Sequence, residues 1–143
     1  MNVILNSFLA FLLTAVSQFN GSLEKSFIQN DASLLRAIFP DSSSVLLTLP
    51  EPLNVSDCFS PDQGFLITRR LFRQISTLEF FIDPENQIVF GQKGAIVQAR
   101  WSFLNKASGR KYVFRLYFYI YPEKGPFNKA VNLKIREIRA ERR

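Results

Sequence analysis

The spacing of apolar residues changes near Ser76, and the change divides the chain into a helical first part and a strand-rich second part. Before Ser76, apolar residues recur at steps of three and four, which is typical of one face of a helix. After it they alternate with polar residues, which is typical of a half-buried strand. Helices followed by antiparallel strands predict an α+β domain whose helices pack together on one face of the sheet.

Capping residues place the helices of the first part. Ser22 is a candidate N-cap for a helix whose apolar positions are Leu23, Phe27 and Ile28, and Asp31 is a candidate cap for a second, short helix that ends at Pro40. Residues 44–49 predict a strand, and a loop is expected from there through the next helix start.

The strongest helix start is Ser60-Pro61-Asp62-Gln63. Ser60 caps the helix, proline occupies the first helical position, and Gln63 completes a capping box. Cys58, just before it, is interpreted as a small apolar filler. The helix is amphipathic, and its apolar positions are Leu66, Ile67, Leu71, Phe72 and Ile75.

Strict alternation predicts the strands of the second part. A first strand is followed by a turn at residues 83–86 and a return through residues 87–91; two long strands and a final strand come after it. The apolar positions of these strands are Leu78, Phe80, Ile82, Ala95, Val97, Ala99, Trp101, Phe103, Tyr112, Phe114, Leu116, Phe118, Ile120, Val131, Leu133 and Ile135.

The two long strands form a hairpin whose register follows from its loop. A four-residue loop from Lys106 to Gly109 suits a type I turn closed by glycine at positive φ. Trp101 then faces Phe114, and one face of the hairpin is continuously apolar. A one-residue slip would mix the two faces, so the hydrophobic pattern selects this register.

The opposite face of the hairpin carries Arg100, Arg115, Tyr117 and Tyr119. The predicted register places the two arginines directly opposite each other, which is unfavourable unless something offsets their charges, such as Glu79 of the neighbouring strand, an anionic ligand or a partner chain. Tyrosine and arginine are enriched in interface hot spots. Three interpretations stay open for this face: a solvated sheet surface, a dimer or partner surface, and an anion site.

The N-terminus is typical of a signal peptide. The apolar run Val3–Val16 is too short to span a bilayer, which needs roughly 20 residues. Ala15 and Ser17 supply small residues at the −3 and −1 positions of a cleavage site. We therefore expect residues 1–17 to be a signal peptide and residues 18–143 to be a single domain without a transmembrane helix, exported to the periplasm or cell exterior. The alternatives are an uncleaved anchor or a first helix buried in the domain.

Composition restricts the chemistry. The chain has no histidine, which removes the commonest general base and metal ligand, and its single cysteine excludes an internal disulfide. We expect no catalytic residues, no metal site and no cofactor. The net charge of +6 lies partly in a C-terminus expected to be solvated and frayed, at Arg136, Arg139, Arg142 and Arg143. No nucleic-acid-binding motif accompanies this charge, so nucleic acid is not an expected partner.

The run of residues 27–39, with its polar break at Asn30-Asp31, and the hairpin of residues 94–121 resemble the nuclear transport factor 2-like superfamily, most nearly its small exported bacterial members of unknown function. The resemblance implies a cone in which a strongly curved antiparallel sheet wraps around N-terminal helices. It also implies an open end that can hold a pocket, and an outer sheet face that often forms a homodimer. Enzymes of the superfamily use an Asp, His or Tyr inside the cone, and this chain lacks the histidine.

A non-catalytic exported binding or protein-interaction module is therefore favoured over an enzyme. Its interface would be the outer sheet face with Arg100, Arg115, Tyr117 and Tyr119, where a homodimer is the expected assembly. The alternative is an enzyme of the lyase or isomerase type that holds a small apolar ligand in the cone. Its lining residues would be Trp101, Tyr112 and Phe114, although plain core packing, with the Tyr112 hydroxyl at the rim, is the favoured interpretation of these residues.

Overall fold

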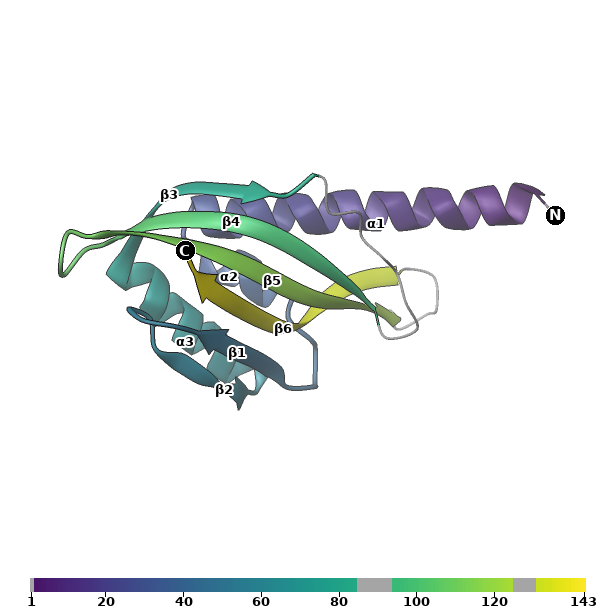
Figure 1. Cartoon of the computed structure of the whole chain (residues 1–143). Helices are drawn as coiled ribbons and strands as arrows, with labels where there is room; N and C mark the ends of the chain where they lie inside the picture. Colours follow the sequence, from purple (N-terminus) through teal and green to yellow (C-terminus); the bar gives the residue numbers. More distant parts are fainter. Residues whose placement is uncertain (1, 85–93, 125–130) are drawn as a thin grey trace.

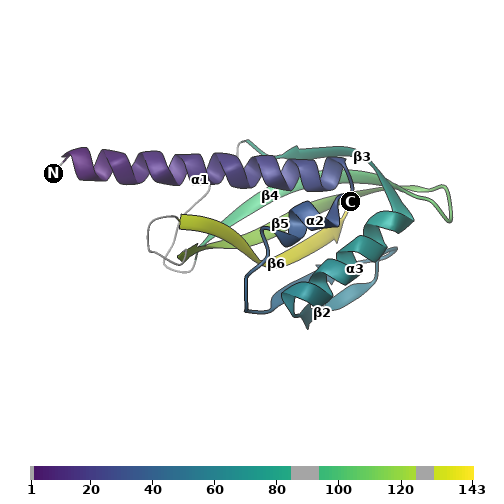
Figure 2. The ribbon, with the colours of Figure 1, turned by 180° about the vertical axis from the view of Figure 1, so that it is seen from behind.

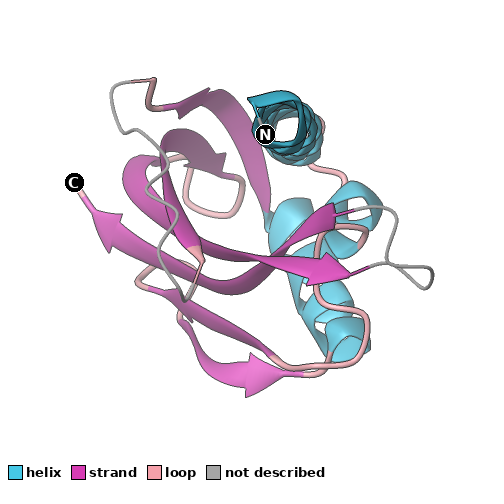
Figure 3. Ribbon diagram, turned by 90° about the vertical axis from the view of Figure 1, so that its right-hand side faces the viewer, coloured by secondary structure: helices cyan, strands magenta, loops and turns pink. Residues whose placement is uncertain are grey.

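The structure is a computed structural model that describes residues 2–84, 94–124 and 131–143. Within these residues, helices lie on one face of a curved sheet (Figures 1 and 2), and the end-on view shows the two layers (Figure 3). The helices are α1 (Asn2–Ile28), α2 (Ala32–Arg36) and α3 (Pro61–Gln74). The strands are β1 (Val45–Leu49), β2 (Val55–Phe59), β3 (Ile75–Ile82), β4 (Ala95–Asn105), β5 (Lys111–Lys124) and β6 (Val131–Arg142). The predicted α+β class is confirmed.

The six strands form one sheet in the order β2-β1-β6-β5-β4-β3. Neighbours pair antiparallel except β1 and β6, which run parallel. The parallel pair was not predicted, because nothing in the local pattern of either segment says which distant strand it will join. β2 was also missed: the expected loop through Cys58 is an edge strand, and Cys58 is exposed on it rather than a buried filler.

The register of the β4–β5 hairpin is confirmed. Trp101 pairs with Phe114, and Arg100 pairs with Arg115. The amide of Gly109 donates to the carbonyl of Asn105 at 2.8 Å, and Gly109 has a φ of +71°, which is a conformation that glycine adopts without strain. A side chain at position 109 would therefore strain the turn.

The apolar side of the hairpin forms the core. Phe103, Phe114 and Phe118 are completely buried there. Phe27 of α1 lies at the centre of their aromatic cluster, stacked on Phe80 with ring centroids 4.6 Å apart and edge-on to Trp101 at 5.0 Å. The predicted assignment of inner and outer faces is correct, since alternate residues of β4 and β5 point to the helices.

α1 is one continuous helix, so Ser22 lies inside it and is not an N-cap as predicted. Gly21 does not interrupt it, because one glycine costs only about 1 kcal/mol in a helix interior. Phe19, Leu23 and Phe27 are buried, whereas Leu13 is 69% exposed. The first turns of α1 extend beyond the sheet (Figure 1). Among the described residues, no helix combines the length and apolarity needed to cross a membrane.

The other two helix starts are confirmed. The carboxylate of Asp31 accepts hydrogen bonds from the amides of Ser33 and Leu34, which caps α2. Ser60 and Gln63 form the predicted capping box of α3. These caps satisfy backbone amides that a helix end otherwise leaves without partners.

Three apolar positions were assigned wrongly. Ile28, the last residue of α1, is 58% exposed. Leu78 is exposed because β3 has a bulge between Thr77 and Glu79, and the extra residue shifts the alternation. Leu66 is exposed on the solvent side of α3. The predicted turn at 83–86 and return at 87–91 lie largely outside the described residues.

The C-terminus is a strand rather than the frayed segment that was expected. β6 continues to Arg142 along β5, with Ile138 and Ala140 buried. The pairing of β6 with β5 shifts register between Tyr119 and Ile120, so the buried positions of β6 pass from Ile135 to Ile138. The arginines of this segment therefore project from an ordered sheet.

Candidate functional site

The outer face of the sheet brings together the four predicted interface residues and one more. We define the Tyr/Arg face as Arg100 on β4, Arg115, Tyr117 and Tyr119 on β5, and Arg139 on β6. Tyr117 lies opposite Arg139, and Arg100 opposite Arg115. Successive side chains of a strand point to opposite faces of the sheet, and the neighbours of these residues face the helices. The side chains of the Tyr/Arg face therefore point away from the helices.

Arg139 contacts both tyrosines of this face. Its guanidinium lies over the ring of Tyr117, 5.1 Å from the centroid, and over that of Tyr119 at 5.9 Å. The phenol of Tyr117 donates to Glu141 at 3.3 Å. The expectation of a frayed C-terminus misses the role of Arg139. The alternation of Glu137, Arg139 and Glu141 with buried residues was the signal that could have revealed it.

The cross-strand arginine pair has a carboxylate beside it, though not the one expected. Glu141 lies directly opposite Arg115 on β6, whereas Glu79 lies opposite Ser102. Within the described residues the ion pairs shorter than 4.0 Å are Arg36–Asp62 and Lys134–Asp41, both away from this face. The guanidinium groups of Arg100 and Arg115 are thus not engaged in direct ion pairs there.

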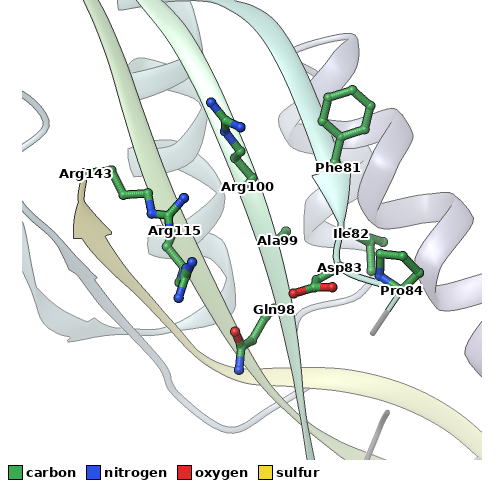
Figure 4. A pocket seen from close by; sticks show the side chains of 9 residues that line it. All are labelled: Phe81, Ile82, Asp83, Pro84, Gln98, Ala99, Arg100, Arg115 and Arg143. Carbon is green, nitrogen blue, oxygen red and sulfur yellow. The ribbon is translucent and has the colours of Figure 1, made fainter. Parts of the chain in front are cut away.

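A hollow of about 250 Å³ lies where the Tyr/Arg face meets β3. Figure 4 shows arginine side chains on one side of it and apolar side chains on the other. The arginines are Arg100, Arg115 and Arg143, and the apolar residues are Phe81, Ile82 and Pro84. The amide of Arg143 donates to the carbonyl of Val113 at 2.9 Å, which holds the end of the chain beside β5. No local pattern around Arg143 indicates that it joins this group.

The three residues predicted to line a pocket lie on the inner face. Trp101 and Phe114 are buried in the aromatic cluster. Tyr112 is half-buried at the hairpin end, stacked on Phe103 with centroids 5.7 Å apart, and Arg142 lies over its ring at 5.0 Å. These contacts are those of core packing, and the ligand-binding role of the three residues stays a prediction.

A polar network joins Trp101 to the end of α1. The indole of Trp101 donates to the hydroxyl of Thr77 at 3.0 Å, and this hydroxyl donates to the side-chain oxygen of Asn30 at 2.6 Å. The amide of Asn30 in turn donates to the carbonyl of Ile75 at 3.0 Å. Each buried polar group here has a partner, so the network positions the bulge of β3 against the helix.

A second polar cluster lies at the other end of the outer face, around Tyr121. Its phenol donates to Glu123 at 3.1 Å and lies 3.3 Å from the hydroxyl of Ser43. Burial, reinforced by Glu123, raises the pKa of Tyr121 above its ordinary value. A hydrogen bond with Glu123, and then the charge of Lys134, lower the pKa of Asp41. The cluster keeps the phenol protonated as a hydrogen-bond donor.

In the described part of the chain, no three His, Cys, Asp or Glu side chains lie close enough together to hold a metal ion. The outer face therefore offers arginine and tyrosine donors, which suit anions, carboxylates of a partner and aromatic contacts.

Comparison with known proteins finds no matching family model and no matching curated sequence. Solved structures do match. A ketosteroid isomerase-like protein from Erwinia carotovora atroseptica is 12% identical with a TM-score of 0.65, over 91% of this chain and 95% of that one. An NTF2-like protein of unknown function in nutrient uptake from Rhodospirillum rubrum is 10% identical with a TM-score of 0.61, over 90% and 98%.

A third match is a hypothetical protein with a ketosteroid isomerase-like fold from Catenulispora acidiphila, in complex with trimethylamine. It is 8% identical with a TM-score of 0.58, over 85% of this chain and 82% of that one. At such identities the likeness concerns the fold and carries no activity across. The curved six-stranded sheet, the helices on its inner face and these matches agree: the chain has the nuclear transport factor 2-like cone fold.

Proposed function

We propose that the chain is an exported, non-catalytic binding module whose Tyr/Arg face associates with a second copy of itself. One observation carries the proposal: β4 and β5 place closely packed aromatic residues on the inner face and exposed or half-buried tyrosine and arginine on the outer face. Such residues are enriched at the centres of protein interfaces.

The chemistry of the face supports a second copy as the partner. Arginines at positions 100, 115 and 139 share it with Glu137 and Glu141, so the face carries both charges. In a two-fold contact each copy presents the same patch, and arginines of one copy can meet glutamates of the other. Ile96, which is 41% exposed opposite Tyr119, adds apolar surface.

The packing of the inner face supports a role without catalysis. Trp101 and Phe103 have ring centroids 4.4 Å apart, and Phe103 meets Phe114 edge-on at 5.0 Å. The alternative is an isomerase-type or lyase-type enzyme with an apolar pocket. Its support is that structural neighbours are named as ketosteroid isomerase-like, and these names describe the neighbours and not this chain. It requires a cavity with a catalytic polar group near Trp101 and Tyr112.

The burial of α1 supports the export part of the proposal. Among the side chains of α1 whose burial is described, the buried ones begin at Phe19, two positions after the predicted cleavage site, and these would stay in the mature chain; the partly buried Ala15 and Val16 would be removed. We expect mass spectrometry of the secreted protein to give a chain that begins at Gln18. An intact N-terminus on protein recovered from the cell would contradict this.

Sedimentation velocity of the full chain tests the dimer. We expect wild type to sediment as a dimer at tens of micromolar, and Tyr117→Glu or Arg139→Glu to weaken association about tenfold or more, since an interfacial charge is left unpaired. The matched control is Leu66→Glu, which places the same charge on an exposed apolar position of α3. A monomeric wild type, or equal dissociation by the control, would refute the proposal.

A further inference from the structure

We propose that the hollow among Arg100, Arg115, Arg143 and Phe81 binds a small molecule that carries an oxyanion, either carboxylate or phosphate, on an aromatic or apolar body. This site goes beyond the dimer proposed above, and it shares Arg100 and Arg115 with the dimer face, so association and anion binding are measured on the same samples. Charge, preorganisation and shape each support it.

The charges around the hollow call for an anion. Three arginine residues line it, and within the described residues none of them belongs to an ion pair shorter than 4.0 Å. Arg100 and Arg115 are direct cross-strand partners, an arrangement that costs free energy. A bound oxyanion offsets this repulsion and accepts hydrogen bonds from arginine, whose planar fork matches both carboxylate and phosphate.

The backbone that carries the arginines is held in place from behind. Trp101 and Phe114, the neighbours of Arg100 and Arg115 along their strands, are buried in the core and pair across the same ladder. Arg143 is held by the hydrogen bond that its backbone amide donates to the carbonyl of Val113. Fixed Cα positions reduce the entropy lost when side chains close on a ligand.

The opposite wall suits an apolar body. Phe81 is 59% exposed on edge strand β3, directly opposite Arg100 in the ladder, and Ile82 and Pro84 continue the wall. At about 250 Å³ the hollow is slightly smaller than the sites of drug-sized ligands, which start near 300 Å³. A single ring with one anionic group is the matching size.

The two sides of the hollow set the orientation of the ligand. Arg100, Arg115 and Arg143 lie on one side, and Phe81, Ile82 and Pro84 lie on the other (Figure 4). Asp83 also lines the hollow, and its amide donates to the carbonyl of Gln98 at 2.9 Å. The oxyanion therefore belongs on the arginine side, and the apolar body belongs beside Phe81 and Pro84.

Calorimetric or NMR titration of the full chain with defined probes tests the site. Phenyl phosphate and benzoate represent the two anion types, inorganic phosphate lacks the ring, and benzyl alcohol lacks the charge. We expect both aromatic anions to bind more tightly than inorganic phosphate, and benzyl alcohol not to bind measurably. The tighter of phenyl phosphate and benzoate identifies the natural anion type.

Paired variants locate the binding. Arg100→Gln with Arg115→Gln should lower the affinity for both anions about tenfold or more, because two charge-assisted contacts are lost. Arg70→Gln with Arg73→Gln removes the same charge from exposed positions of α3 and should leave affinity within about twofold. Phe81→Ala should weaken phenyl phosphate about threefold or more and leave inorganic phosphate unchanged.

Several outcomes would overturn the site. The first is that none of the anions binds saturably. The second is that the α3 control variant loses as much affinity as the Arg100 and Arg115 variant. The third is that the Arg100 and Arg115 variant keeps its affinity while circular dichroism shows that it is folded. Sedimentation of the same samples separates this inference from the proposed dimer. A monomer that binds phenyl phosphate refutes only the dimer, and a dimer that binds no anion refutes only the site.

Discussion

The two faces of the β4–β5 hairpin share one backbone and differ in almost everything else. Phe103, Phe114 and Phe118 are fully buried on the inner face, whereas Arg100 and Tyr117 lie on the outer face one residue away from buried neighbours. Since the side-chain period of a strand is two, one short segment specifies both a core and a recognition surface. Substitutions on the two faces should therefore affect different properties.

Phe114→Ala should produce the largest loss of stability. It removes a completely buried ring that meets Trp101 and Phe103, and such truncations cost about 3–5 kcal/mol through lost burial and the cavity left behind. Its partner on the outer face is Tyr117→Ala, expected to cost about 1 kcal/mol or less. Urea unfolding compares the two, and similar losses would break the distinction between the faces.

Thr77→Val should have the next largest effect. It leaves the indole N–H of Trp101 and the side-chain oxygen of Asn30 without their hydrogen-bond partner, which costs about 1–3 kcal/mol for buried groups. Thr77→Ser is the control because it keeps the hydroxyl. If both variants lose the same stability in urea unfolding, the methyl group and not the network is what matters.

Arg100→Gln should change stability little, and in the opposite direction. It removes one member of a cross-strand like-charge pair, so the free energy of unfolding should stay the same or rise by about 0.2–1 kcal/mol. The rise should shrink at high salt, because exposed charges are screened. Arg70→Gln on α3 serves as the control. A clear destabilisation would show that Arg100 makes a stabilising contact on the outer face.

The smallest effect concerns Tyr121, at the edge of the outer face. Its pKa in the folded chain is raised above the ordinary value near 10 by burial first and by Glu123 next. The stability linked to its neutral phenol is therefore complete below pH 10 and is lost as pH rises through the raised pKa. Absorbance titration at 295 nm should show a high-pH phase that Tyr121→Phe abolishes and Ser43→Ala retains. A phase that survives Tyr121→Phe would assign it elsewhere.

Local chemistry was enough to predict much of this molecule. The capping box at Ser60, the cap at Asp31 and the hairpin loop that ends at Gly109 each depend on residues within a few positions of one another. The register of β4 against β5 follows from the same kind of information, since only one alignment keeps Trp101 and Phe114 on the apolar side. The resemblance to the nuclear transport factor 2-like superfamily, in the order of helices and strands, predicted the cone fold.

The tertiary structure decided what depends on distant segments meeting. It paired β1 in parallel with β6, shifted the alternation of β3 at its bulge, and placed Arg139 over Tyr117. It also brought Arg143 to the hollow formed by Arg100 and Arg115. Periodicity along a chain reports which side of a segment is apolar. Which segments become neighbours is set by packing the whole core at once. The sequence therefore predicted four of the five residues of the Tyr/Arg face, while Arg139 and the hollow beside the face came only from the folded chain.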